Sequence, residues 1–140
     1  MSAALREGAR LLCGHERRGA LYAPTVLDHV PRSCELVTEE TFGPVLPIVR
    51  VSGLDDAIAL VNGGRYGLST GLVTNRLDWV QRAVERLEVG SVNVGEVPGW
   101  RTELSPFGGV KDSGTGHKEG VLEALRFMTN LKTYSLPWEP

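Results

Sequence analysis

The sequence lacks the long apolar run that a membrane-spanning helix requires. Its apolar stretches extend over a few residues, whereas a span takes about 20. Near the N-terminus, Arg6, Glu7 and Arg10 interrupt the apolar residues, so the apolar region of a signal peptide is missing. We therefore expect a cytoplasmic protein with no membrane partner.

An excess of charge of either sign is also missing. The chain has 15 Lys and Arg against 17 Asp and Glu, a formal net charge of −2. A basic surface that binds nucleic acid or anionic lipid is therefore not indicated. The chain has 140 residues, of which 41% are hydrophobic, and this is typical of one globular domain.

Cysteine is scarce, because Cys13 and Cys34 are the only two in the chain. They are far apart and neither belongs to a CxxC pair, so we expect reduced thiols that are buried or half-buried. A zinc site formed by Cys13, His15, His29 and Cys34 is conceivable. Its spacing matches no structural zinc pattern.

Hydrophobic periodicity predicts that strands and helices alternate in the middle of the chain. Strands are expected at 45–51, 69–74 and 91–94. Between them lie two amphipathic helices, one ended by Gly63 and one capped by Asn75. Their apolar faces consist of Leu54, Ala57, Ile58 and Val61, and of Val80, Ala83, Val84 and Leu87. This order predicts an α/β fold with a parallel sheet and right-handed crossovers.

The two ends of the chain give weaker patterns. The first dozen residues are typical of a helix that Gly14 ends, and 21–27 of a strand. A third helix is predicted at 118–127, with Val121, Leu122 and Leu125 facing inward. An alternating strand at 131–136 closes the chain. It must pair with an internal edge or with another subunit.

Arg101 is the first candidate for binding a ligand. It follows the strand at 91–94, and ligands of open parallel sheets gather at the carboxyl ends of strands. An arginine beside Trp100 in a stiff loop is suited to grip a carboxylate, phosphate or phosphonate. The alternative is a surface arginine paired with Glu96 or Glu103. The glycines that follow do not form a phosphate-binding loop of the GK[ST] type, and we expect them to serve loop structure.

Glu40 and Phe42 form a second candidate site, in the rigid turn "EETFGP". A carboxylate there can accept hydrogen bonds from both hydroxyls of a ribose, and the ring can lie against a nicotinamide. The alternative is a solvated acidic turn with Phe42 in the core. No arrangement of a nucleophile with a base is present in the sequence.

Four motifs in order resemble the C-terminal part of the NAD(P)-dependent aldehyde dehydrogenase superfamily. They are "EETFGPVLPI", "YGLSTGLVTN", "GSVNV" and "SPFGGVKDSGTG", and the resemblance covers nearly the whole chain. It implies that 1–128 is the C-terminal part of the catalytic domain, and that 129–140 is an oligomerisation strand and tail. The implied cofactor is NAD or NADP, and the implied partners are identical subunits or the remainder of the enzyme.

The resemblance also implies roles for single residues. Glu40 would bind the nicotinamide ribose and Phe42 would lie beside the nicotinamide ring. Loop 96–104 would shape the substrate entrance, with Trp100, Arg101 and Phe107 on the substrate side. Within the superfamily this loop most resembles phosphonoacetaldehyde dehydrogenases, in which the loop arginine helps to grip the phosphonate.

We therefore expect an oxidoreductase that converts an anionic aldehyde, phosphonoacetaldehyde, to phosphonoacetate. The alternatives are a dehydrogenase of lactaldehyde or another small aldehyde, and a non-catalytic assembly module. In the family the catalytic cysteine and the general-base glutamate lie upstream of the first motif found here. The resemblance thus implies a C-terminal segment that is inactive alone, with apolar edges and faces left uncovered.

Overall fold

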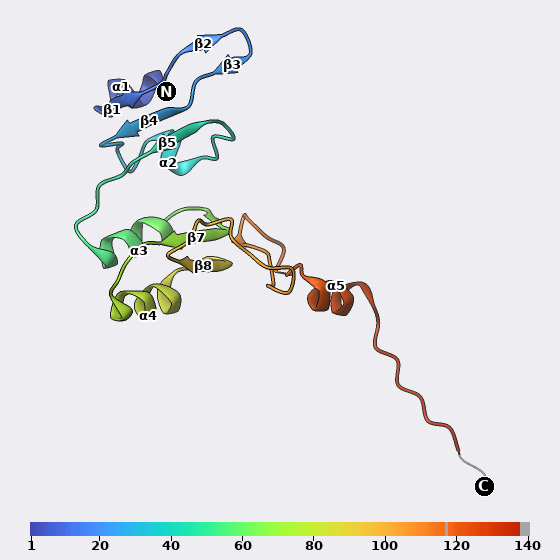
Figure 1. The fold of residues 1–140 in the computed structure, drawn as a ribbon. Helices are drawn as coiled ribbons and strands as arrows, with labels where there is room; N and C mark the ends of the chain where they lie inside the picture. Colours follow the sequence, from blue (N-terminus) through green and yellow to red (C-terminus); the bar gives the residue numbers. More distant parts are fainter. Residues whose placement is uncertain (117, 138–140) are drawn as a thin grey trace. The chain divides into compact units, whose positions relative to one another are not determined.

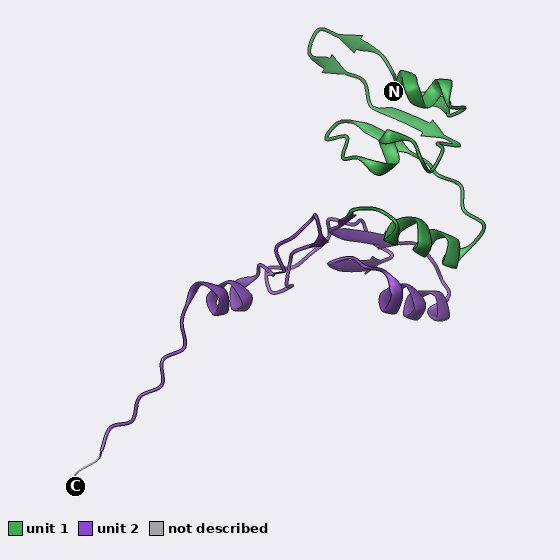
Figure 2. Cartoon of the chain, turned by 180° about the vertical axis from the view of Figure 1, so that it is seen from behind, with its two compact units in different colours: residues 1–65 green, residues 66–140 purple. Residues whose placement is uncertain are grey.

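The computed structural model describes residues 1–116 and 118–137, which form two compact units (Figure 2). Unit 1 comprises Met1–Arg65 and unit 2 comprises Tyr66–Pro140. Both units combine short helices with short strands, as Figure 1 shows. No helix among the described residues has the length and apolar character that crossing a membrane requires.

Unit 1 is built on a three-stranded sheet with the strand order β1-β4-β5. β1 (Arg10–Cys13) pairs antiparallel with β4 (Thr25–Asp28). On its other side, β4 pairs in parallel with β5 (Val45–Pro47). The central strand is the most buried one, because Leu27 has no exposed surface and Thr25 has 1%.

Two further strands and three helices complete unit 1. β2 (Arg17–Arg18) and β3 (Leu21–Tyr22) form an antiparallel hairpin in the chain segment that connects β1 to β4. The helices are α1 (Ser2–Arg6), α2 (Glu35–Thr38) and α3 (Leu54–Asn62). The core consists of small and aliphatic side chains and one thiol, namely Ala4, Ala9, Leu27, Val30 and Cys34.

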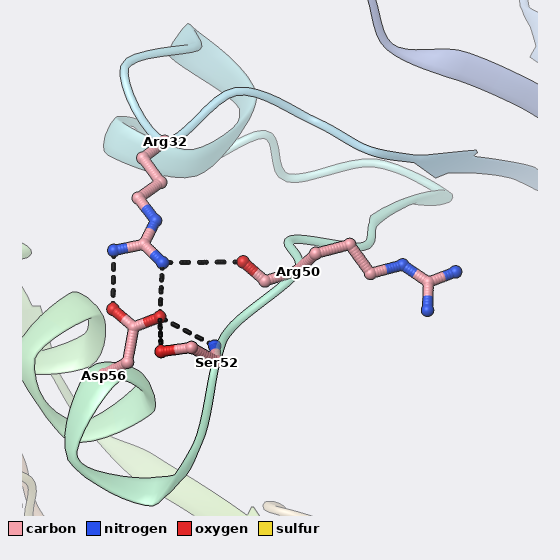
Figure 3. A network of polar contacts seen from close by, with 4 residues as sticks. All are labelled: Arg32, Arg50, Ser52 and Asp56. Carbon is pink, nitrogen blue, oxygen red and sulfur yellow. Dashed lines mark hydrogen bonds and ion pairs between the residues drawn. The ribbon is translucent and has the colours of Figure 1, made fainter.

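A polar network holds the start of α3 (Figure 3). Arg32 donates from Nη1 and Nη2 to the two carboxylate oxygens of Asp56, at 2.7 Å each. Asp56 also accepts a hydrogen bond of 2.8 Å from the backbone N–H of Ser52. The Arg32 bonds hold the pKa of the Asp56 carboxyl well below its usual range. The Arg50 side chain points away and binds Asp28, whose carboxyl pKa it lowers in the same way.

Unit 2 contains a parallel pair of strands joined by a helix. β7 (Ser69–Leu72) and β8 (Ser91–Val94) pair in parallel along their whole lengths, with α4 (Leu77–Arg86) as the connection. β6 (Tyr66–Gly67) pairs antiparallel with β9 (Val110–Lys111). The last helix is α5 (Val121–Met128).

The predicted α/β pattern in the middle of the chain is confirmed by α3, β7, α4 and β8. The predicted parallel pairing is present among the described residues, in two separate sheets. β5 pairs with β4 in the sheet of unit 1, and β7 pairs with β8 in a separate sheet of unit 2. The strand predicted at 45–51 is shorter, because its pairing with β4 ends at Pro47.

The predictions for the N-terminal segment need correction. The helix ends at Arg6, since Gly8 adopts a φ of 101° that favours glycine. Residues that were expected to continue it form β1, because pairing with β4 satisfies their backbone groups. The strand expected at 21–27 is interrupted before Thr25, next to Pro24, which has no N–H to donate.

The two cysteine thiols are free and differ in exposure. Cys34 is buried as expected, whereas Cys13 is exposed, because all of β1 lies at the surface. Among residues 1–116 and 118–137, no group of three His, Cys, Asp or Glu side chains is placed to hold a metal ion.

The expected cap of α4 is wrong by one position. The helix begins after Arg76 rather than Asn75, and no side-chain hydrogen bond caps it. On its predicted apolar face, Ala83 is fully buried but Val84 is 56% exposed. The helix therefore buries a narrower stripe than its periodicity predicts.

The C-terminal predictions differ most from the structure. α5 forms near the expected place, but the residues expected to face inward are exposed by 53% at Val121, 60% at Leu122 and 57% at Leu125. No strand is formed within 129–137, because no described strand edge pairs with this segment. Residues 138–140 of the predicted tail lie outside the described residues. The uncovered apolar surface expected for this chain is present here, with Leu131 exposed by 95%.

Candidate functional site

The turn at 39–43 in unit 1 presents an acidic and an aromatic side chain together. Phe42 has a φ of 46°, a left-handed conformation that is uncommon outside glycine. Its side chain is 93% exposed, so the alternative of a core phenylalanine is wrong. The turn is fixed at its end, where the Thr25 N–H donates to the Pro44 carbonyl at 2.8 Å.

The two adjacent carboxylates of this turn have different surroundings. Glu39 forms an ion pair with Arg65, with 3.4 Å between Oε2 and Nη1. Both residues line a pocket of about 480 Å³ between the segments of α2 and α3. Glu40 is exposed and has no hydrogen-bond or ion-pair partner among the described residues. Its carboxylate is therefore accessible from solvent, and its predicted contact with a ribose stays a prediction.

In unit 2, loop 96–104 is anchored on the parallel strand pair. Asn93 of β8 donates from Nδ2 to the backbone carbonyls of Val97, Pro98 and Trp100, at 3.1, 2.9 and 3.0 Å. Ser69 of β7 donates from Oγ to the same Pro98 carbonyl. The loop thus leaves the carboxyl end of β8 and folds back over the strand pair as far as Ser69, the first residue of β7.

Arg101 leaves this anchored loop and lies over an aromatic ring. Its guanidinium carbon is 4.3 Å from the centroid of the Phe107 ring, within the range of a cation–π contact. Within the described residues it forms no ion pair with Glu96 or Glu103, so the alternative of a surface ion pair is wrong. Trp100, the neighbouring residue, is 52% exposed.

A pocket of about 380 Å³ opens beside Arg101. Its other polar side chains are those of Thr102, Ser105, Glu103 and Glu119. The Thr102 and Ser105 hydroxyls are 2.8 Å apart and hydrogen-bonded to each other. The pocket therefore offers one cation and two hydroxyls to an anion, against two carboxylates that oppose it.

The glycine-rich segment that follows Arg101 is held by backbone pairing between Phe107 and Glu119. Phe107 and Glu119 exchange two hydrogen bonds, of 2.8 Å and 2.5 Å between N and O. Lys118 donates from Nζ to the carbonyls of Gly90, at 3.0 Å, and Gly108. A Cβ added to Gly114 would lie 2.1 Å from the Gly109 carbonyl oxygen. In this region glycine thus serves close backbone approach, as predicted.

The predicted site residues fall into two groups. Glu40 and Phe42 share one turn of unit 1, while Trp100, Arg101 and Phe107 gather in unit 2. Sequence reasoning missed the anchoring residues Asn93, Ser69 and Lys118. An asparagine inside a short apolar strand was the available signal for the first, because Asn is depleted in strands.

The aldehyde dehydrogenase family model matches residues 1–134 of this chain. The chain belongs to the aldehyde dehydrogenase family. It is 38% identical over 130 residues to a sulfoacetaldehyde dehydrogenase from Neptuniibacter caesariensis, a match over 93% of this chain and 28% of the relative. It is 40% identical over 126 residues to a 3-sulfolactaldehyde dehydrogenase from Priestia megaterium, a match over 90% of this chain and 26% of the relative.

Solved structures share the fold. A glyceraldehyde-3-phosphate dehydrogenase from Methanocaldococcus jannaschii, complexed with NADP, matches with a TM-score of 0.87 and 39% identity, over 94% of this chain and 28% of that one. Aldehyde dehydrogenase 21 from Physcomitrella patens, in complex with succinate, matches with a TM-score of 0.85 and 38% identity, over 91% and 26%. The chain thus spans about a quarter of the length of these relatives.

Proposed function

We propose that this chain forms the substrate entrance and the nicotinamide side of a cytoplasmic, NAD- or NADP-dependent aldehyde dehydrogenase. The enzyme would oxidise a small anionic aldehyde, such as phosphonoacetaldehyde, to its acid. The observation that carries the proposal is Arg101, an exposed guanidinium in an anchored loop with no carboxylate paired to it among the described residues.

The chemistry of Arg101 suits an anionic substrate. A guanidinium presents planar N–H donors that match the oxygens of phosphonate, sulfonate or carboxylate groups. Stacking on Phe107 limits the directions in which these donors point. Two of the similar relatives are named for sulfonated aldehydes, which supports a tetrahedral oxyanion as the charged group.

The turn at 39–43 fits the nicotinamide end of the cofactor. The Glu40 carboxylate would accept hydrogen bonds from the ribose hydroxyls, and the exposed Phe42 ring would lie beside the nicotinamide. When bound, the cofactor would be the oxidant of the reaction, because it would accept the hydride. The left-handed backbone at Phe42 keeps the ring directed outward for this contact.

We assign neither the nucleophile nor the general base of this reaction to residues 1–140. Aldehyde oxidation of this type requires a thiolate that attacks the carbonyl carbon and a base that activates water. These groups would come from the remainder of the enzyme. The exposed apolar face of α5 and the segment that follows would be covered there or by an identical subunit.

The test is Arg101→Ala in the native polypeptide that carries this sequence. Loss of hydrogen bonds to a charged group removes about 1.5–3 kcal/mol, so KM for phosphonoacetaldehyde should rise about tenfold or more. KM for a neutral aldehyde of similar length should change little. Steady-state NAD(P)+ reduction measures both, and Arg101→Lys should retain part of the preference.

The matched control is Arg18→Ala, which removes an exposed arginine from the hairpin of unit 1. It should leave both KM values unchanged. Equal increases for the anionic and the neutral aldehyde in Arg101→Ala would argue against the anion site. That result would favour lactaldehyde or another small neutral aldehyde as the substrate, and absence of any aldehyde oxidation would favour an assembly module.

A further inference from the structure

The side-chain amide of Asn93 contacts the backbone of loop 96–104 at three points. Its Nδ2 lies 3.1 Å from the Val97 carbonyl oxygen, 2.9 Å from that of Pro98 and 3.0 Å from that of Trp100. One amide has two N–H donors, so they are shared among the three acceptors. The peptide bond joins the Trp100 carbonyl carbon to the backbone nitrogen of Arg101. Asn93 therefore fixes the point at which Arg101 leaves the loop.

Strand β7 supports the same loop from the neighbouring position. Ser69 donates from Oγ to the Pro98 carbonyl, which Asn93 also contacts. Gly71 allows the loop to approach the strand, because an added Cβ would lie 2.7 Å from the Glu96 carbonyl oxygen. Ser69, Gly71 and Asn93 together hold the loop against the β7–β8 pair, from the first residue of β7 to the third residue of β8.

We propose that Asn93 is the positioning residue that holds Arg101 over Phe107 and so sets the preference for anionic over neutral aldehydes. This inference rests on the proposed function of Arg101 and extends it to a residue that contacts the loop and not the substrate. Arg101 alone has many side-chain conformations. Anchoring of its backbone, together with the ring contact at 4.3 Å, confines the guanidinium to the pocket that it lines.

The chemistry of the site requires an amide donor. Alanine at this position would leave the three carbonyls without their shared donor. Aspartate has the same shape as asparagine but, when ionised, it has acceptors only. Its oxygens would face the loop carbonyls and repel them. Asn93→Asp therefore tests donation separately from size.

The test compares kcat/KM for phosphonoacetaldehyde and for a neutral aldehyde of similar length in the native polypeptide. Asn93→Ala should lower the preference for the anionic aldehyde about tenfold, the upper range for loss of a hydrogen bond. The change should appear in KM more than in kcat. Asn93→Asp should lower the preference at least as far, and Asn93→Ala combined with Arg101→Ala should lower it little beyond Arg101→Ala alone.

The matched control is Asn75→Ala, which removes an exposed asparagine that has no partner among the described residues. It should leave the preference unchanged. If Arg101→Ala abolishes the preference while Asn93→Ala preserves it, the positioning role is wrong and the proposed function stands. If Arg101→Ala has no effect on the preference, both are wrong.

A second readout does not require activity. Trypsin cleaves after arginine, and its rate at Arg101 reports how firmly the loop is held. Asn93→Ala and Ser69→Ala should each raise the cleavage rate after Arg101 severalfold relative to cleavage after Arg18. Unchanged ratios in both variants would overturn the proposal. If Asn93→Ala unfolds the protein and raises cleavage at both sites, Ser69→Ala decides.

Discussion

Units 1 and 2 hold their candidate site residues by different means. In unit 1, the turn with Glu40 and Phe42 lies between β4 and β5 of one sheet, and Leu27 of the central strand β4 is fully enclosed. In unit 2, Ala83 is the buried apolar residue among those described, and loop 96–104 is held by hydrogen bonds from Asn93 and Ser69. Positions in unit 1 thus depend on apolar burial, whereas those in unit 2 depend on donors and on close backbone approach.

The largest effect is expected from Leu27→Ala in unit 1. Truncating a fully buried leucine costs about 2–5 kcal/mol, from lost burial and from the cavity left behind. Hydrogen exchange of the native polypeptide should therefore accelerate in β4 and β5 more than in β7 and β8. Leu21→Ala is the matched control, since Leu21 is 77% exposed and its loss should be nearly neutral. Equal acceleration in both units would contradict this local role of the core.

A smaller effect is expected from Gly90→Ala in unit 2. The new Cβ would lie 1.9 Å from the Gly108 carbonyl oxygen and 2.7 Å from that of Leu68. Both contacts are with backbone, so the strands must separate, at about 1–3 kcal/mol. Exchange should accelerate in β8 and β9. Gly99→Ala is the control, because no atom lies within 4 Å of its added Cβ. Equal effects of the two substitutions would contradict the close approach.

The smallest effect is expected from acid pH, which lowers the free energy of unfolding by weakening two ion pairs of unit 1. Arg50 lowers the pKa of Asp28, and Arg32 lowers that of Asp56, relative to the unfolded chain. Their stabilisation is therefore complete above the unfolded pKa of about 3.9 and is lost as the pH falls below it. The effect is limited, because the side chains of both arginine partners are exposed to solvent.

Unfolding followed by circular dichroism between neutral and acid pH would measure this loss. Asp28→Asn should flatten the pH dependence of the unfolding free energy. Asp78→Asn in unit 2 should change it less, because the Asp78 carboxylate is 57% exposed. A steeper dependence in Asp28→Asn than in the unsubstituted protein would contradict the assignment.

Local sequence patterns predicted α3, in which Leu54 and Ile58 are buried, and β8, which is half-buried. α3 and β8 formed where the apolar spacing placed them, and Gly63 ended α3. The predictions failed where pairing depends on a distant segment. The strand β1 resembles a helix in its spacing, yet it pairs with β4, and such a partner cannot be inferred from local spacing.

The candidate site was predictable in its side chains but not in its supports. Arg101 and Phe42 stand out by their residue type and by the turns around them, and the structure exposes both. The ring beneath Arg101 was not predicted as its contact, because Phe107 reaches it only through folding of the loop. The anchoring by Asn93 depends on which backbone carbonyls of the loop face β8. The periodicity of the local sequence does not predict that orientation.

The bridge between Phe107 and Glu119 is made by backbone groups alone. Any residue except proline can take part in such a pairing, because only proline lacks the N–H. The closure of the segment is thus independent of the side chain that faces Arg101. A substitution at 107 would therefore change the side chain beneath Arg101 and leave the backbone pairing in place. The backbone that closes the segment and the side chain that contacts Arg101 can thus change independently of each other.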